Sequence, residues 1–384
     1  MPKAIAERYL KLGLQLGRHD GSVVDAYFGP PELAAGISAA PPVPLRTLVA
    51  DAEALLDDLD DGWIRDQVMG LRTYAGVLAG EPIPYADEVE GCYGVRPVHT
   101  DEAAFAAAHE QLGDLLPGDG PLAERYQGWR DSILVPSDLV VPTMAAVIDE
   151  ARSMTRDLVD LPDGEQVILE TARDESWMAY NFYLGGLRGR IAVNTSLSMS
   201  AIELLHIAIH ETYPGHQAER AAKEQLLVRG RGLIEETLVL GPTPQSLVSE
   251  GIGELAPRWL LAGEAGVKLA AIVHRAGIGF DLAHALAVEQ VRMQCQWALV
   301  NVALMLHEGG ASGVEAHEYL WRWGLVNSEQ ASHAVRFIAG PGSRSYVTVY
   351  PAGLALCSAY VGGDPQRLRY LLTEQVRVRD LTLG

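Results

Sequence analysis

A proline-glycine pair inside an otherwise helical segment is the feature that most constrains this chain. The segment AIELLHIAIHETYPG reads as a helix, and Pro214-Gly215 interrupts it just before His216. Proline has no N–H to donate to the carbonyl four residues earlier, and its ring collides with that carbonyl. The helix must therefore break or bulge at this point. The following glycine permits backbone angles that other residues rarely adopt.

The break decides whether His210 and His216 can meet. In a straight helix the two residues would lie roughly 120° apart around the axis and about 9 Å apart along it. Two imidazoles so placed cannot share one metal ion. A short bulge at Tyr213-Pro214-Gly215 would restore the spacing of a single turn. The same Pro-Gly pair is also typical of an ordinary helix end.

With such a bulge, His210, Glu211 and His216 form a stretched version of the zinc-peptidase signature HExxH. The histidines supply two neutral nitrogen ligands, and Glu211 stays off the metal as a general base for water. Zinc in hydrolases usually keeps a third protein ligand, for which Glu250 is the best candidate. Glu254 lies one turn after Glu250 on the same helix face, so it is predicted to orient a histidine from behind. Zinc is the expected cofactor, although manganese or cobalt also suits this ligand set.

His206 and His210 form a competing pair. They lie four residues apart and share a helix face, as the two histidines of an HxxxH zinc motif do. This alternative leaves Glu211 and the Pro-Gly pair without a role, so we favour the site that contains His216.

The overall composition excludes some classes of function. The chain has 384 residues, of which 48% are hydrophobic, which is typical of a folded protein rather than a disordered one. Its net charge of −20 would repel phosphate backbones, so we expect no nucleic-acid partner. The oligomeric state is left open.

The expected compartment is the cytoplasm. Cys92, Cys295 and Cys357 lie far apart and form no CxxC motif, which favours a reducing environment. The first twenty residues resemble the start of an amphipathic helix rather than a signal peptide. No apolar run reaches membrane-spanning length, so no membrane partner is expected.

The pattern along the chain predicts a mainly α (α+β) fold. Periodic Ala/Leu-rich segments separated by Pro/Gly-rich joints predict helices up to about residue 130. The segments EQVILETA, SWMAYNFYLG and RGRIAVNTS predict a small antiparallel sheet of about three strands before the motif helix. Helices resume after Ser200. We divide the chain into an N-terminal helical region, 1–135, and a catalytic region, 136–384, which together are expected to form one compact unit.

A long stretch around the motif resembles a known family. The sequence NFYLGGLRGRIAVNTSLSMSAIELLHIAIHETYPGHQAE is similar to the bacterial family called domain of unknown function 885, whose members carry an HE-x-x-PGH core. The segments VDAYFGP, CYGVRP, SEGIGE and RSYVTVYPAG extend the resemblance over most of the chain. It implies a zincin-like fold, related to metal-dependent carboxypeptidases and oligopeptidases.

The resemblance also implies residue roles. His210 and His216 match the family's ligands, Glu211 its catalytic carboxylate, and Glu250 the glutamate of its downstream Glu-Gly motif. Many members have a second histidine directly after PGH, where this chain has Gln217. If that histidine is a true ligand, the site of this chain is damaged. Gln217 would still be able to hydrogen-bond a substrate or a water.

Further residues are predicted to bind substrate. Arg344 would hold the terminal carboxylate of a peptide. Tyr346 or Tyr350 would donate to the oxyanion, as a late tyrosine does in helical oligopeptidases that resemble this family. If substrate pairs with the strand before the motif helix, Asn194 and Arg190 lie near the cleft. Otherwise Arg190 is an ordinary charge on an exposed strand. Independently of this, the alternative for both tyrosines is that they pack in the core with satisfied hydroxyls.

The expected function is hydrolysis of peptides by a zinc-dependent carboxypeptidase or oligopeptidase. Two alternatives remain open on the sequence alone. One is a non-catalytic helical binding protein that has lost its metal, for which Gln217 is the argument. The other is a metal-dependent hydrolase of non-peptide amides or esters, which would use the same residues.

Overall fold

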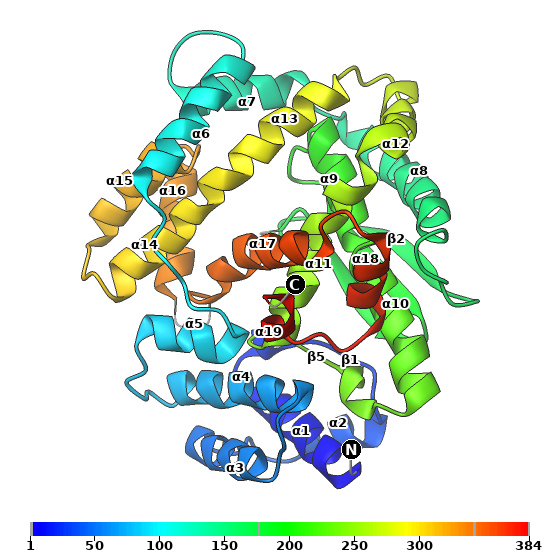
Figure 1. The fold of residues 1–384 in the computed structure, drawn as a ribbon, viewed down its shortest axis with the longest axis vertical. Helices are drawn as coiled ribbons and strands as arrows, with labels where there is room; N and C mark the ends of the chain where they lie inside the picture. Colours follow the sequence, from blue (N-terminus) through cyan, green and yellow to red (C-terminus); the bar gives the residue numbers. More distant parts are fainter. Residues whose placement is uncertain (1–2, 176, 341–342, 383–384) are drawn as a thin grey trace.

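The computed structural model describes residues 3–175, 177–340 and 343–382. It confirms a mainly helical fold with a small sheet before the motif helix (Figure 1). Helices surround a central helix, α11 (Pro244–Leu260), on several sides. The first helix, α1 (Lys3–Leu16), lies at the lower end of the view, whereas the last, α19 (Val378–Leu381), lies near its middle.

The N-terminal part is helical, as its periodicity predicts, and short proline-containing joints separate its helices. Its helices are α1 (Lys3–Leu16), α2 (Pro31–Ala39), α3 (Leu45–Asp57), α4 (Trp63–Leu78), α5 (Tyr85–Tyr93), α6 (Glu102–Leu115), α7 (Leu122–Ser132) and α8 (Ser137–Thr155). A short strand that the sequence pattern did not reveal, β1 (Val24–Tyr27), pairs antiparallel with β5 (Leu238–Leu240). This pairing ties the N-terminal part to the segment before α11.

The three predicted strands form one sheet, but the sheet is mixed rather than antiparallel. Strands β2 (Gln166–Ala172), β3 (Ala179–Gly185) and β4 (Arg188–Asn194) lie in the order β2-β4-β3. A tight turn makes β3 and β4 an antiparallel hairpin. After β2 the chain crosses to the opposite edge of the sheet, where it forms β3. It then turns back as β4 between β2 and β3, so β4 runs parallel to β2. The middle strand is therefore paired along both edges.

The rest of the chain is again helical, with α9 opened by a capping box in which Ser200 and Glu203 bond each other's backbone. Its helices are α9 (Ala201–Glu211), α10 (His216–Lys223), α11 (Pro244–Leu260), α12 (Gly263–Arg275), α13 (Leu282–Arg292), α14 (Trp297–His307), α15 (Gly313–Trp323), α16 (Ser328–Ala339), α17 (Val349–Val361), α18 (Pro365–Thr373) and α19 (Val378–Leu381).

Helix α11 carries the candidate glutamates and is held very close to α17. A Cβ on Gly251 would lie 2.5 Å from the carbonyl oxygen of Gly353, and one on Gly353 would lie 2.4 Å from the carbonyl oxygen of Leu247. Only glycine at both positions permits this approach. On its other side α11 contacts α9. The glutamates of SEGIGE are thus fixed between two helices.

Two large apolar clusters form the core. One joins helices near both ends of the chain, from Tyr9 to Leu381. The other packs the sheet, α8, α9, α12 and α13 around residues such as Met144 and Ile209. The division at residue 135 stays a prediction.

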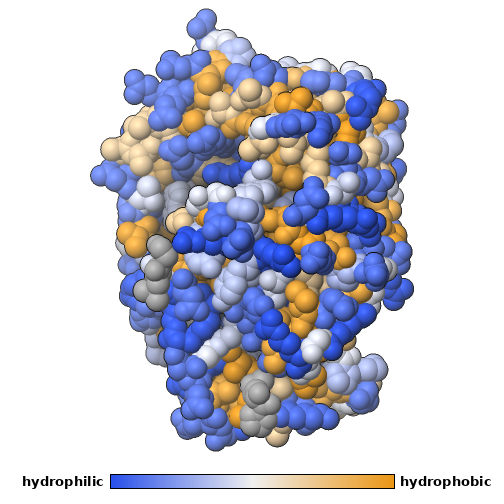
Figure 2. Space-filling model, turned by 45° about the vertical axis from the view of Figure 1, so that its right-hand side comes forward, coloured by the Kyte–Doolittle hydropathy of each residue, from blue (hydrophilic) through white to orange (hydrophobic). Residues whose placement is uncertain are grey.

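Hydrophilic residues cover much of the molecular face in Figure 2, with hydrophobic ones between them. In the part of the chain that the structure describes, no helix combines the length and apolar character needed to span a membrane.

Candidate metal centre

The helix break predicted at Pro214 is confirmed. Helix α9 ends at Glu211 and α10 begins at His216, so two separate helices replace a single bulged one. A Cβ on Gly215 would lie 1.9 Å from the carbonyl oxygen of His210, which only glycine avoids. The imidazole rings of His210 and His216 come within 4.7 Å of each other, measured between centroids.

Glu250 of α11 meets both imidazoles. Its Oε2 lies 3.4 Å from Nε2 of His210 and 3.7 Å from Nε2 of His216. Two ligands at about 2.1 Å from a tetrahedral zinc ion are about 3.4 Å apart, so this spacing suits a shared metal. Oε2 is buried and has no hydrogen-bond partner. An oxygen left this way is costly unless a cation satisfies it. The three residues therefore fit a zinc ion.

The surrounding charges also favour a cation. Burial acts to lower the pKa of the His210 imidazole, but contact with Glu250 and the charges of Glu211 and Glu254 raise it to about 9. Burial acts to raise the pKa of the Glu250 carboxyl, but its contacts with His210 and His216 hold it well below its usual value. The negative charges of these glutamates thus stabilise a positive charge near His210.

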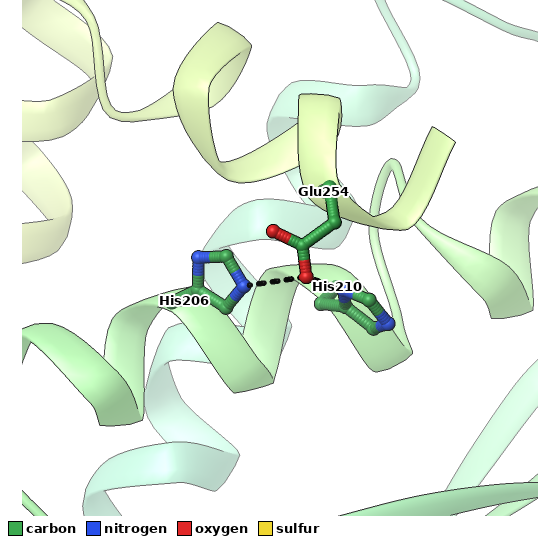
Figure 3. A group of neighbouring side chains, drawn as sticks. All are labelled: His206, His210 and Glu254. Carbon is green, nitrogen blue, oxygen red and sulfur yellow. Dashed lines mark ion pairs between the residues drawn. The ribbon is translucent and has the colours of Figure 1, made fainter. Parts of the chain in front are cut away.

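Glu254 lies behind His210. Its Oε1 is 3.5 Å from Nδ1 of His210 and 3.5 Å from Nε2 of His206 (Figure 3). Burial acts to raise the pKa of the Glu254 carboxyl, but the two histidines lower it to about 2. A carboxylate at Nδ1 favours a metal ligand through Nε2, as predicted for Glu254. The competing group of His206, His210 and Glu254 is also close enough to hold a metal. That group, however, leaves out His216 and the orphaned oxygen of Glu250.

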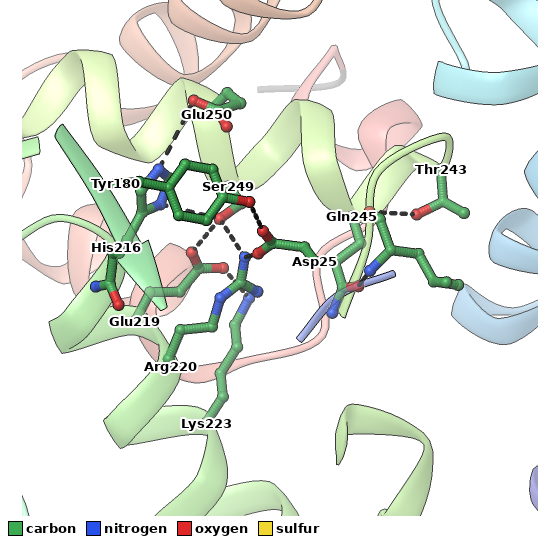
Figure 4. Close-up of polar contacts among 12 residues, drawn as sticks. Asp25, Tyr180, His216, Glu219, Arg220, Lys223, Thr243, Gln245, Ser249 and Glu250 are labelled. Carbon is green, nitrogen blue, oxygen red and sulfur yellow. Dashed lines mark hydrogen bonds and ion pairs between the residues drawn. The ribbon is translucent and has the colours of Figure 1, made fainter. Parts of the chain in front are cut away.

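His216 is oriented by a buried polar network on α10 and α11. Its Nδ1 lies 3.2 Å from Oγ of Ser249, which donates to Glu219 over 2.6 Å (Figure 4). Arg220 donates to the same Oγ over 3.1 Å, and Lys223 donates to Glu219 over 2.7 Å. Because the Ser249 proton is committed to Glu219, Oγ accepts from Nδ1–H of His216. The Nε2 lone pair is then directed to the side of Glu250.

Glu211 and the three candidate ligands, His210, His216 and Glu250, line a cavity of about 540 Å³. Burial raises the pKa of the Glu211 carboxyl above its usual value, against the opposing charges of His210 and His216. The side-chain amide of Asn181 donates to the Glu211 carbonyl over 2.7 Å and so fixes the end of α9. A carboxyl group with a raised pKa beside these candidate ligands suits proton transfer to and from a substrate.

Both candidate tyrosines line this cavity. The hydroxyl of Tyr346 donates to Oε1 of Glu250 over 2.9 Å. Tyr350 packs edge-on against Tyr346, with 5.6 Å between the ring centroids. Tyr346 therefore holds Glu250 in place, and Tyr350 is the one of the two whose hydroxyl is not bonded to Glu250.

Comparison with known proteins shows a shared fold. No family model and no curated protein matches the chain. A "putative lipoprotein" from Colwellia psychrerythraea has a TM-score of 0.52 at 13% identity, and the match covers 88% of this chain and 62% of that one. A "putative lipoprotein of unknown function" from Shewanella oneidensis also has a TM-score of 0.52, at 12% identity over 92% of this chain and 76% of that one. This chain thus spans less than two thirds of the Colwellia protein.

Three predicted substrate-binding residues lie away from the cavity lining. Arg344 donates through Nε to the buried carboxylate of Glu88 over 2.7 Å, so its charge is already compensated. Asn194 donates to the carbonyls of Glu175 and Trp177 in the loop before β3. Arg190 covers the ring of Phe182 at 4.3 Å. Asn194 and Arg190 belong to β4, the middle strand, whereas residues of the edge strand β3 line the cavity.

Gln217 is also placed away from the metal cluster. It is fully buried and donates to Oε1 of Glu165 over 2.8 Å. Its Oε1 lies so close to Gly189 of β4 that a Cβ there would be 2.0 Å away. The side chain of residue 217 faces the sheet. Glutamine instead of histidine at this position therefore removes no candidate ligand from the group of His210, His216 and Glu250. The expected contact of Gln217 with substrate is corrected for the same reason.

Sequence reasoning missed the network around His216. Ser249 precedes Glu250, and Glu219 and Arg220 lie three and four residues after His216. Their spacing along the helix from His216 and Glu250 was therefore the signal that could have identified them. Asp25 and Tyr180, which also line the cavity and contact each other, come from distant strands and offered no such signal.

Gly253 supports the ring of His210. A Cβ at this position would lie 2.7 Å from Cε1 and 2.9 Å from Nε2 of the imidazole. We expect Gly253→Ala to tilt the ring and to weaken zinc binding about tenfold, as changes behind a metal ligand do. Zinc affinity measured by competition with a chromophoric chelator checks this. Gly128→Ala on α7, where an added Cβ meets nothing within 4 Å, is the matched control. Equal affinities for both variants would contradict the role of Gly253.

Proposed function

We propose that this protein is a zinc-dependent hydrolase that cleaves amide bonds in peptides. One observation carries the proposal: Nε2 of His210, Nε2 of His216 and the orphaned Oε2 of Glu250 converge beside a cavity that Glu211 also lines. Two imidazoles and one carboxylate, with a second carboxylate off the metal, are the parts of a hydrolytic zinc site.

His210, His216 and Glu250 would hold the metal. A bound zinc ion polarises a carbonyl group and lowers the pKa of water. The chain itself fixes the ligands, through Glu254 behind His210, Ser249 behind His216 and Tyr346 at Glu250. Fixed ligands retain their geometry during the reaction, which lowers the cost of reorganisation.

Glu211 would act as the general base and acid. Its carboxylate takes a proton from the attacking water and passes it to the nitrogen of the leaving amine. The raised pKa of its carboxyl, caused by burial, brings it closer to the pH at which both transfers are efficient.

The cavity favours an oligopeptidase over a carboxypeptidase. The carboxypeptidase expectation rested on Arg344, whose charge is paired with Glu88 away from the cavity lining. Aromatic side chains line much of the cavity instead, among them Trp177, Tyr180 and Tyr350. Such walls suit apolar or aromatic side chains of a peptide.

Tyr350 is assigned as the donor to the oxyanion. We expect Tyr350→Phe to lower kcat about a hundredfold with little change in KM, because an oxyanion contact forms mainly in the transition state. Tyr370→Phe, on α18 outside the cavity lining, is the matched control. Peptide hydrolysis measured over a range of substrate concentrations checks the split. A changed KM with unchanged kcat would assign Tyr350 to ground-state binding instead.

The test of the function is cleavage of a mixture of short synthetic peptides by zinc-loaded protein, read by mass spectrometry. New termini that disappear on chelation and return with zinc would support the proposal. Cleavage of ester or simple amide probes without cleavage of any peptide would favour the hydrolase of non-peptide substrates. No cleavage of either kind by a zinc-loaded protein would favour a binding protein.

The family and the cellular location of the protein are also proposals. Membership of the domain of unknown function 885 family is supported by the HE-x-x-PGH core. A cytoplasmic location is supported by the dispersed cysteines.

A further inference from the structure

A second cavity of about 500 Å³ lies next to the metal centre and has no part in the proposed reaction. Helices α9, α11 and α13 provide most of its wall. Glu254 and His206 line it, whereas His210 and Glu250 line the first cavity. Its apolar lining includes Ile202, Ile207, Pro257, Leu261, Leu286 and Met293. Half of the described lining residues are polar or charged, and a cavity of this size can hold a small molecule that combines an apolar body with a polar group.

The carboxylates in this wall already have partners. Glu203 accepts from Nε of Arg130 over 2.8 Å, and Glu289 accepts from Nε of Arg292 over 2.6 Å. Glu254 contacts two imidazoles, as described above. An incoming cation would have to displace one of these contacts.

Arg258 differs from the other charged residues of this wall in its contacts. Its guanidinium contacts the sulfur of Met293 at 2.9 Å, and it forms no ion pair with any described carboxylate. Burial lowers the pKa of this guanidinium, the charge of Glu254 raises it, and the charge of nearby Arg292 lowers it. Arg258 lines the cavity but is exposed, with Arg292 nearby, and an anion that reaches its guanidinium directly would form the charged pair that it lacks.

We propose that the second cavity binds a small monocarboxylate, with the carboxylate on Arg258 and an apolar body against the helix walls. A planar carboxylate can accept two parallel hydrogen bonds from a guanidinium. The carboxylates of Glu203, Glu254 and Glu289 disfavour a doubly charged phosphate in the same space. The proposal is independent of hydrolysis, and it places the occupant against Glu254, the residue behind His210.

Calorimetric titration of the full chain with phenylbutyrate and with its neutral amide tests this site. The protein is first stripped of metal and dialysed, so that the carboxylate has no metal ion to bind. We expect the acid to bind at least about tenfold more tightly than the amide, because only the acid forms the charged pair with Arg258.

Two variants locate the binding. Arg258→Met keeps an unbranched apolar stem and removes the charged guanidinium, and it should weaken the acid about tenfold while leaving the amide unchanged. Arg275→Met, at the exposed end of α12 outside the cavity lining, should bind the acid as the wild type does. Equal affinity for acid and amide, an unchanged Arg258→Met, or no binding of the acid at millimolar concentration would each overturn the proposal.

Discussion

Glu211→Gln is expected to lower kcat for peptide hydrolysis about a thousandfold while the protein retains its zinc. Glutamine preserves the size of the side chain but cannot accept a proton, and general acid-base catalysis typically contributes about a hundred- to ten-thousandfold. Glu211 is not among the three residues that converge as ligands, so metal content should be unaffected. Rates with the best peptide substrate, together with zinc content of the same sample, check both halves of the prediction.

The control for this variant is Glu329→Gln, an exposed glutamate in the first turn of α16. It should match the wild type in rate and zinc content. Turnover by Glu211→Gln within a few-fold of the wild type would remove Glu211 from the mechanism. Loss of zinc together with activity would instead make Glu211 part of the metal site.

Gly215→Ala is expected to cost about 3 kcal/mol of folding free energy, a large effect for one methyl group. The added Cβ would meet the carbonyl oxygens of His210 and Ile209 at 1.9 and 2.4 Å. These are backbone atoms at the end of α9, so no side-chain rotation relieves the collision. The helix end must shift, and His210 and His216 should move apart with loss of zinc binding.

Urea unfolding followed by circular dichroism measures this cost, and zinc content of the folded protein measures the effect on the site. Gly128→Ala is again the control, and it should be neutral or slightly stabilising because alanine is the better helix former. An unchanged unfolding midpoint with full zinc content would mean that the junction at Gly215 tolerates a side chain, contrary to the geometry.

Local signals predicted much of the fold. The Pro-Gly pair acts through its own backbone, so the break between Glu211 and His216 could be read directly from the sequence. The three strands were recognisable from their residues. Their order was not, because parallel pairing of β2 with β4 depends on where the chain crosses the sheet. That order also decided which strand lines the cavity.

The same distinction between local and long-range signals applies to the candidate site. Glu250 and Glu254 were predictable because they lie one turn apart on a helix that follows the motif. Arg344 was misjudged because its partner, Glu88, is 256 residues away and its burial has no local signature. Gln217 follows a ligand directly, yet adjacent residues on a helix point about 100° apart. The glutamine therefore faces the sheet while His216 faces Glu250.

Zinc content is the most direct test of the central claim that His210, His216 and Glu250 form a metal centre. Plasma mass spectrometry would compare the wild type, His210→Ala, and His333→Ala as an exposed-histidine control on α16. The structure leads us to expect about one zinc per chain in the wild type and the control, and almost none in His210→Ala. A wild type that holds no metal even after loading, or a His210→Ala variant that holds as much as the control, would contradict the account.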